Sequence, residues 1–353
     1  MSSTKASNAV LAIARAKFGK RITAEDLTRM ASLTGVAEVA DYLKKTRFAE
    51  EMEKSGVTQW RRGSLESVLK KQSMAEIYDL CGFEKKIGSP VMSLYVMELE
   101  VDEIISFVRF LAAGQPEKYI YTMPPEVREL AGIDLAAMSQ LQTEQELADF
   151  LGEYELYRPA LQTIRKAENG QINLTPLEAG LDRIIYRRSL KILNENFSGN
   201  ELVQLRVLVK LKAEAGDIET IYRAKRFFGE TPDMIRTLMV GDGALLNKRQ
   251  TDRLIHADNT EEFCRILRAT AYGKYLTDEG EPESFSFTLQ ALFERLIHCI
   301  HFSSCPAAVT LAYISYLSIE RKNIIHIIEG VRYGLPAEEI VKTLHIMRKQ
   351  EVE

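Results

Sequence analysis

The amino-acid sequence predicts an all-α protein built from three similar helical segments, and three observations lead to this prediction. Apolar residues recur at three- and four-residue spacing through most of the chain, which is typical of amphipathic helices, whereas the two-residue alternation of strands is nearly absent. Glycine and proline gather in short clusters between these stretches, as they do at helix ends and turns. The third observation is an internal repeat of more than 100 residues.

Length and composition limit the class of protein. A chain of 353 residues with 46% hydrophobic residues can bury a sizeable core and suggests two or three domains. The 46 Lys and Arg residues nearly balance 50 Asp and Glu residues, so the net charge of -4 gives no basic footprint for nucleic acid, and we expect no nucleic-acid partner. Four irregularly spaced cysteines do not form a disulfide framework, which favours a reducing compartment.

Two segments resemble targeting or membrane sequences, and for both the sequence favours an ordinary helix. The first 21 residues lack acids and carry five cations, as organelle transit peptides do, but an ordinary first helix that runs into its neighbour is favoured. Residues 296–319 contain no Lys, Arg, Asp or Glu and are long enough to span a bilayer. Because the run contains two histidines, four serines and Pro306, we expect the end of one buried helix and the start of another.

Helical periodicity is clearest in residues 98–111, 219–228 and 311–331. The cluster Gly88-Ser89-Pro90 and the clusters that follow Gly114 and Gly229 are predicted to be helix ends with turns. The last two divide the chain into comparable lengths, which predicts three helical repeats over residues 1–115, 116–230 and 231–353. A repeat of this length is too long for one solenoid unit, so each repeat is expected to form a small domain.

The repeat is visible at a first motif that begins with glutamate and ends with leucine. Its final leucines are 108 and then 116 residues apart, and an aromatic residue follows each motif closely. The three occurrences are EVADYL (38–43) followed by Phe48, ELADFL (146–151) followed by Tyr157, and EFCRIL (262–267) followed by Tyr272.

A second motif gives an independent and similar period. A glutamate precedes an acid or amide by three positions and an isoleucine by four, and these glutamates are 114 and then 106 residues apart. The polar residues could satisfy free N–H groups at the start of a helix, or form a polar edge on an unbroken helix, and the sequence does not decide between the two. The occurrences are Glu100-Glu103-Ile104, Glu214-Asp217-Ile218 and Glu320-Asn323-Ile324, with closing glycines expected at Gly114, Gly229 and Gly334.

Motifs for catalysis and for cofactors are missing from the sequence. There is no phosphate-binding GxxxxGK[ST] loop, no HExxH, no GxSxG and no CxxC, so we predict neither an enzyme nor a bound cofactor. His298, His301 and Cys305 share a helix face and could converge on zinc. The stretch 296–319 that holds them contains no carboxylate and Pro306 follows directly, so buried core residues are favoured and no metal is predicted.

The last third of the chain carries a series of short motifs in a fixed order. They are Tyr316-Leu317, Glu320, Asn323-Ile324, Arg332-Tyr333, Gly334-Leu335 and Glu338-Glu339-Ile340. With these residues it resembles the C-terminal part of the C subunit of V-type ATPases and ATP synthases, which is the bacterial and archaeal counterpart of the d subunit of the eukaryotic V-ATPase. The opening, with Asn8-Ala9-Val10, Arg15 and Lys17, looks like the start of that family. One departure is Ile325-His326, where the family often carries a basic residue.

The resemblance implies a non-catalytic central-stalk subunit that couples a rotor shaft to a membrane proteolipid ring for proton or sodium transport. It implies a funnel of three similar helical domains with pseudo-three-fold symmetry, peripheral on the cytoplasmic side, with membrane contact only through the ring. Glu320, Asn323 and Arg332 are polar positions on the most family-like helix, so they are predicted to contact these partners, although they could instead hold helix ends together. The competing hypotheses are a helical scaffold with unrelated partners and a helical metalloprotein that uses His298 and His301.

Overall fold

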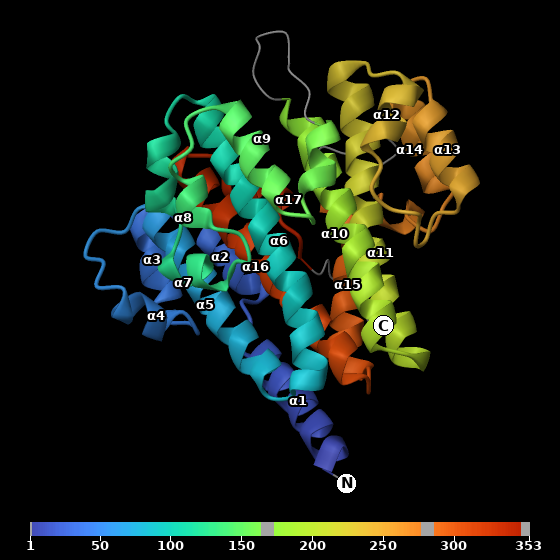
Figure 1. Ribbon diagram of the computed structural model, residues 1–353. Helices are drawn as coiled ribbons and strands as arrows, with labels where there is room; N and C mark the ends of the chain where they lie inside the picture. The colour runs from blue at the N-terminus through green and yellow to red at the C-terminus, as the bar shows by residue number, and fades with distance from the viewer. Residues whose placement is uncertain (1, 164–172, 277–285, 347–353) are drawn as a thin grey trace. The chain divides into compact units, whose positions relative to one another are not determined.

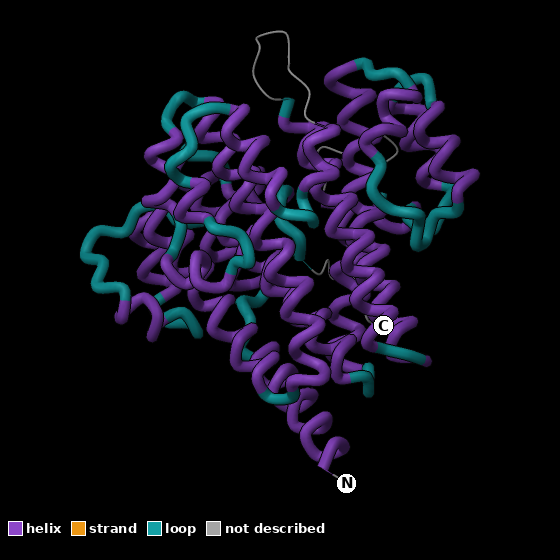
Figure 2. The backbone as a smooth tube through the Cα atoms, viewed as in Figure 1, coloured by secondary structure: helices purple, strands orange, loops and turns teal. Residues whose placement is uncertain are grey.

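The structure is a computed structural model that describes residues 2–163, 173–276 and 286–346. Within these residues the chain forms helices and loops and no strand, so the all-α prediction is confirmed (Figure 2). The chain divides into two compact units. Unit 1 comprises Met1–Met92, Gly199–Leu208 and Tyr275–Glu353, and unit 2 comprises Ser93–Ser198 and Val209–Lys274. The division into three domains stays a prediction.

Unit 1 is built around α16 (Pro306–Arg332), the red helix of Figure 1. This helix is apolar on nearly all sides, as a helix must be when neighbours cover it all round. Its neighbours come from both ends of the chain: α1 (Ser2–Gly19), α2 (Ala24–Ala31), α3 (Val36–Leu43), α5 (Arg62–Gly82), α15 (Ser286–Phe302) and α17 (Ala337–Lys342). The short α4 (Ala49–Lys54) packs on α5.

The core of unit 1 joins residues from the first 70 positions to residues from the last 30. Leu43 and Met30 are fully buried in one cluster with Ile324 and Ile328 of α16 and with Ile340 of α17. The predicted break in residues 296–319 is confirmed, because α15 ends at Phe302 and α16 begins at Pro306, in the first turn where proline fits a helix. None of the described helices has the length and apolar character needed to cross a membrane.

Unit 2 contains most of two long helices that begin in unit 1, α6 (Lys85–Ala112) and α11 (Gly199–Arg223), together with α10 (Leu174–Asn196). Short helices follow α6 and α11, and those after α11 form a compact group at its end (Figure 1). After α6 these are η1 (Pro116–Thr122), α7 (Pro125–Leu130), α8 (Leu135–Met138), α9 (Glu144–Glu153) and η2 (Arg158–Thr163); after α11 they are η3 (Ala224–Phe228), α12 (Pro232–Leu238), α13 (Lys248–His256), α14 (Thr260–Arg268) and η4 (Gly273–Tyr275).

The predicted glycine ends are confirmed at Gly114, Gly229 and Gly334, which have φ values of 67°, 58° and 68°. A left-handed residue of this kind turns the chain away from a helix end, and glycine adopts it without strain. The stretch from Glu214 to Gly229 is one residue longer than the equivalent stretches from Glu100 to Gly114 and from Glu320 to Gly334. The extra residue is taken up by the π-helix η3, which follows α11 directly.

The prediction of a helix end at Gly88-Ser89-Pro90 is wrong, because these residues lie inside α6. Glycine is needed at position 88 because its Cα lies close to the backbone at the end of α5. A Cβ atom on Gly88 would lie 1.8 Å from the carbonyl oxygen of Cys81, so no other residue fits without movement of the backbone.

Candidate functional site

The second motif of each repeat lies in the middle of a long unbroken helix. We call its two polar residues the polar pair of that repeat, so the three polar pairs are Glu100/Glu103 on α6, Glu214/Asp217 on α11 and Glu320/Asn323 on α16. The unbroken helix was one of the two alternatives that the sequence left open. All six side chains are buried, with at most 7% of the residue exposed, so they form no solvent-facing edge. Buried polar groups need partners, and each pair finds them outside its own helix.

The polar pair of α6 binds the residues that follow that helix. Glu100 accepts hydrogen bonds from the backbone N–H of Gly132 and from the hydroxyl of Tyr157. Glu103 accepts a hydrogen bond of 2.9 Å from the hydroxyl of Tyr119. Burial raises the pKa of both tyrosines, and the neighbouring glutamates raise it further, so both hydroxyls stay protonated and can donate.

The polar pair of α11 binds the residues that follow α11 in the same way. Glu214 accepts backbone N–H groups from residues 244, 245 and 246 at 2.6, 2.9 and 2.9 Å, and the hydroxyl of Tyr272 at 2.9 Å. Asp217 accepts the N–H groups of Val240 and Gly241 at 2.7 and 2.9 Å. Burial raises the pKa of Asp217 to about 6, although the two N–H donors lower it in part.

The polar pair of α16 binds both ends of the chain. Glu320 accepts the N–H of Ile22 at 2.8 Å and an ion-pair bond from Arg47. The side-chain amide of Asn323 donates to the carbonyl of His345 at 2.8 Å and accepts from its N–H at 2.9 Å. The third repeat thus returns to the first repeat for two of its partners.

The three sets of contacts follow one plan. Glu100 accepts a hydrogen bond from the N–H of Gly132, and Glu214 accepts one from the N–H of Leu246. In both cases the donor lies 32 positions further along the chain. Leu246 directly precedes the N-cap of α13, and Ile22 directly precedes the N-cap of α2. The glutamate of each polar pair therefore fastens its helix to the next repeat, and Glu320 fastens the last repeat to the first, whereas Asn323 binds within its own repeat.

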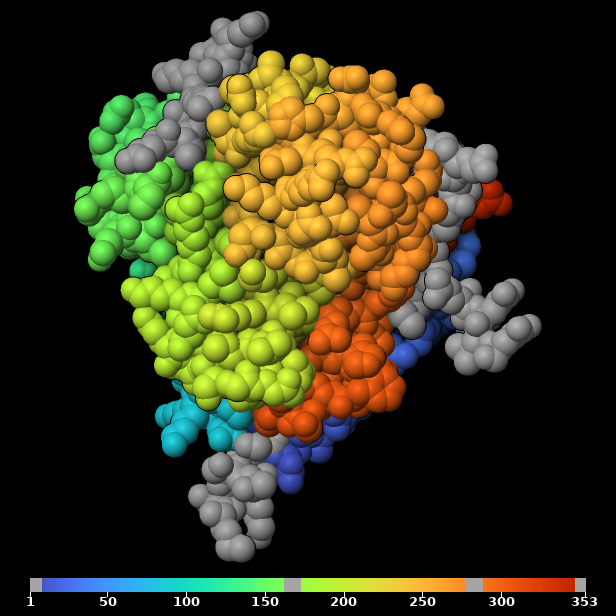
Figure 3. Space-filling view, turned by 90° about the vertical axis from the view of Figure 1, so that its right-hand side faces the viewer, coloured from blue at the N-terminus to red at the C-terminus, as the bar shows by residue number. Residues whose placement is uncertain are grey.

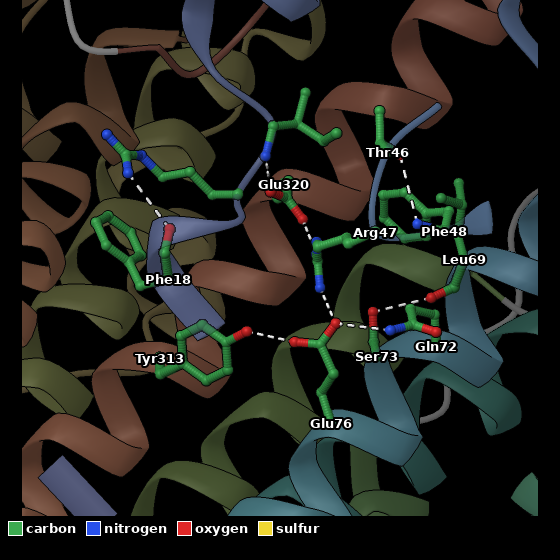
Figure 4. A network of polar contacts seen from close by, with 12 residues as sticks. Phe18, Thr46, Arg47, Phe48, Leu69, Gln72, Ser73, Glu76, Tyr313 and Glu320 are labelled. Atoms are coloured by element: carbon green, nitrogen blue, oxygen red, sulfur yellow. Dashed lines mark hydrogen bonds and ion pairs between the residues drawn. The ribbon is translucent and has the colours of Figure 1, made fainter. Parts of the chain in front are cut away.

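The third set differs from the others in its electrostatics. Phe48 stands where the other repeats have Tyr157 and Tyr272, so it brings no hydroxyl to the glutamate. Its neighbour Arg47 takes that role, and Figure 4 shows its guanidinium between Glu320 and Glu76.

The ion pairs around Arg47 are deeply buried. The side chains of Arg47 and Glu76 are each 7% exposed and that of Glu320 is 2% exposed. Burial by itself lowers the pKa of Arg47, but the two carboxylates raise it above its usual range. Glu76 also accepts hydrogen bonds from the hydroxyl of Tyr313 and, at 2.9 Å, from the amide of Gln72.

The structure places the three predicted partner-contact residues in two different environments. Glu320 and Asn323 are buried and bound to other parts of unit 1, an arrangement suited to the alternative that they hold elements together. Arg332 is exposed at the last turn of α16, with its guanidinium 5.4 Å from the ring centre of Tyr333. Contact with a partner stays a prediction for all three residues.

The residues considered for a metal site are arranged for packing. His298 and His301 are exposed rather than buried as expected, because they lie on the outer side of α15, and each contacts the ring of Phe302. Cys305 is only partly buried, and it accepts a hydrogen bond of 3.3 Å from the amide of Gln204, whereas Cys299 on α15 is buried. In the part of the chain that the structure describes, no three His, Cys, Asp or Glu side chains gather as metal ligands do.

Arg47 and Glu76 belong to the buried ion-pair network at Glu320, and neither was among the residues predicted from the sequence. Glu76 shares a helix face with the buried Leu65, Leu69 and Leu80 on α5, and a charge at an apolar position is a usable signal. For Arg47 the signal is its place beside Phe48, which has no hydroxyl, whereas the aromatic residues that follow the other two occurrences of the first motif are tyrosines.

Comparison with known proteins gives a consistent result. Residues 10–343 match the model of the family described as ATP synthase (C/AC39) subunit. The chain is 22% identical over 306 residues to the C subunit of the A-type ATP synthase of Methanosarcina acetivorans, a match that covers 86% of this chain and 80% of the relative. It is 24% identical over 251 residues to the C subunit of the A-type ATP synthase of Desulfurococcus sp., a match that covers 68% of this chain and 64% of that relative.

Proposed function

Because this chain belongs to the ATP synthase (C/AC39) subunit family, we propose that it is the central-stalk subunit that joins the rotor shaft of an A/V-type ATPase or synthase to the membrane proteolipid ring. Its role is mechanical and non-catalytic: it passes rotation between the shaft and the ring and so couples ATP turnover to proton or sodium transport. It lies on the cytoplasmic side and meets the membrane through the ring.

The observation that carries the proposal is the repeated fastening of long helices by buried polar pairs. A part that transmits torque has to resist deformation, and a buried carboxylate whose oxygens all accept hydrogen bonds strongly favours one geometry over others. Glu214 has four such donors and Glu100 has two. Carboxylates engaged in this way support the chain itself and are poorly suited to act on a substrate.

The repeated contacts also support three similar helical domains in a funnel with pseudo-three-fold symmetry. Glu100 and Glu214 each bind the repeat that follows them, and Glu320 returns to Ile22 and Arg47 at the beginning of the chain. A cyclic order of contacts is what a closed arrangement of three repeats requires. In this arrangement the wide face rests on the ring and the opening receives the shaft.

Arg332 is the predicted contact residue best placed for a partner. It is exposed beside Tyr333, which is 69% exposed, and Leu335, which is 47% exposed. Exposed arginine and tyrosine are enriched where proteins bind one another. We therefore assign partner contact to Arg332, and an internal structural role to Glu320 and Asn323.

The test is purification from detergent-solubilised membranes with a tagged chain. Recovery of the shaft subunits and the proteolipid ring supports the proposal, and recovery of neither, or of unrelated proteins only, overturns it in favour of a scaffold with other partners. Arg332→Glu is expected to weaken this recovery at unchanged melting temperature. Glu320→Gln is the matched variant on the same helix, and it is expected to lower the melting temperature.

A further inference from the structure

Helix α13 in unit 2 carries a group of cations on its exposed side. The cations Lys248, Arg249 and Arg253 are exposed, and so is the neighbouring His256. We call these four residues the basic face of α13. The opposite side of the helix, with Leu254 and Ile255, is buried. The segment from α12 to α14 forms the upper part of the surface in Figure 3, where it is coloured yellow to orange.

The basic face is not neutralised by the chain around it. The one carboxylate on this side of α13, Asp252, lies 3.4 Å from Arg236 of α12. Among the described residues no carboxylate forms an ion pair with Lys248, Arg249 or Arg253. Asp252 and the four residues of the basic face border one open patch of surface along this helix.

The fold does not require Lys248 and Arg249, because the equivalent helix of the first repeat has no cation in its first turn. Arg253 does have a counterpart in that helix, Arg29. The N-caps Thr23 of α2 and Asn247 of α13 each lie 20 residues before the last leucine of the first motif, and both close a capping box. Where α13 begins with Lys248 and Arg249, α2 begins with Ala24 and Glu25.

The position of two of these cations opposes the stability of their own helix. The N-terminal end of a helix carries a partial positive charge, so anions are favourable there and cations are unfavourable. Glu25 in α2 follows this rule, whereas Lys248 and Arg249 in α13 break it. A local choice that weakens its own element indicates a role beyond folding.

We propose that the basic face of α13 docks on an acidic surface of a protein partner in the rotary complex. This inference rests on the proposed function, which supplies the complex. Arginine guanidinium groups form paired hydrogen bonds with carboxylates, and Arg249 and Arg253 lie four residues apart on one side of the helix. A membrane surface fits less well, because a helix that lies on lipid turns its apolar side to the bilayer, and Leu254 and Ile255 are turned into unit 2.

The test replaces the first two residues of α13 by those of α2, in the variant Lys248→Ala/Arg249→Glu. This variant keeps the capping box, and its new glutamate favours the helix, so its melting temperature is expected to equal or exceed that of the wild type. The control, Arg128→Ala/Arg188→Glu, makes the same change in net charge at two exposed arginines of unit 2 outside α13. Both are compared with the wild type for binding to purified shaft subunits and to the detergent-solubilised ring, separately.

We expect the α13 variant to bind one of these probes about tenfold more weakly at low salt, and the control to bind like the wild type. The difference should shrink near about 0.5 M salt, because added ions screen exposed charges. If the wild type binds and the α13 variant binds equally well, the inference is overturned and the proposed function stands. If the wild type binds neither probe, both are overturned.

Binding to vesicles of phosphatidylcholine with phosphatidylglycerol distinguishes a protein partner from a lipid surface. Binding of the wild type to these vesicles that is lost in the α13 variant, with protein binding unchanged, identifies a membrane contact and overturns the acidic protein partner.

Discussion

Tyrosine hydroxyls secure the buried glutamates of α6 and α11, but the two glutamates depend on them to different degrees. Tyr157 is the hydrogen-bond donor to Oε2 of Glu100, whose other oxygen binds the N–H of Gly132. Glu214 has backbone donors at both oxygens in addition to Tyr272. Loss of a donor is most unfavourable where it leaves a buried oxygen without any partner.

Tyr157→Phe is therefore expected to lower the free energy of unfolding by about 2–3 kcal/mol, and Tyr272→Phe by about 1 kcal/mol. Phenylalanine fits the same space, and Phe48 occupies the equivalent position of the first repeat. Urea denaturation of both variants measures the two values. Equal losses would contradict the role assigned to the backbone donors of Glu214.

Asp217 makes the stability of unit 2 depend on pH. Its pKa is raised from 3.8 to about 6 in the folded protein, chiefly by burial. Between these values the folded state keeps a proton that the unfolded state has released, so the free energy of unfolding falls as pH rises through this window. The size of the effect is on the order of 2–3 kcal/mol.

Asp217→Asn removes this titration. The difference in the free energy of unfolding between the wild type and the variant is expected to fall by about 2–3 kcal/mol between about pH 4 and pH 7. Urea denaturation at each pH measures this difference. Asp233→Asn, at an exposed position of α12, is the control. A constant difference between wild type and Asp217→Asn across this range would refute the assignment.

At the scale of elements, α16 and α17 pack so closely that α16 requires a glycine, Gly330, where it faces α17. A Cβ atom on Gly330 would lie 2.5 Å from Cγ1 of Ile340. Ile340 is 2% exposed and belongs to the core of unit 1, so it has little room to move.

Gly330→Ala is expected to destabilise the protein by about 1–3 kcal/mol, because it forces α17 away from α16. Gly216 provides the matched control, since it lies within α11 and a Cβ there meets nothing within 4 Å. Gly216→Ala should raise the free energy of unfolding by about 0.5–1 kcal/mol through the helix preference of alanine. Thermal melting distinguishes the two signs, and stabilisation by both would show that α17 adjusts freely.

Most helix ends were predictable because their causes are local. The end expected at Gly88-Ser89-Pro90 was wrong, because Gly88 is needed for its close approach to the backbone of Cys81. Gly114, Gly229 and Gly334 act within one turn of the chain, and Pro306 acts on its own helix. The partners of the polar pairs were not predictable, because helical spacing tells which face a residue occupies and not what covers that face. Glu320 meets a backbone group 298 residues away, at Ile22.

At the scale of the molecule, unit 1 depends on both ends of the chain. Ile340 and Leu344 of the C-terminal segment are 2% and 4% exposed in a core that includes the first repeat. A chain that ends at Leu335 loses both side chains and the two hydrogen bonds of Asn323. We expect its free energy of unfolding to fall by about 3–6 kcal/mol.

A chain that ends at Ile346 is the control for this truncation, since it keeps every contact of the C-terminal segment named here. It should match the full chain in urea denaturation. Equal stability of the chain that ends at Leu335 would mean that α17 adds nothing to unit 1.

The cyclic order of the polar-pair contacts has a consequence for biosynthesis. Glu100 and Tyr157 are 57 positions apart and Glu214 and Tyr272 are 58 apart, so each of these contacts can form soon after its helix has left the ribosome. Ile22 and Arg47 are made early, but they must wait for Glu320 until translation is nearly complete. During that interval the apolar surface of the first repeat lacks the helix that covers it, and such surfaces recruit chaperones or aggregate. The beginning of the chain is thus the part whose folding ends last.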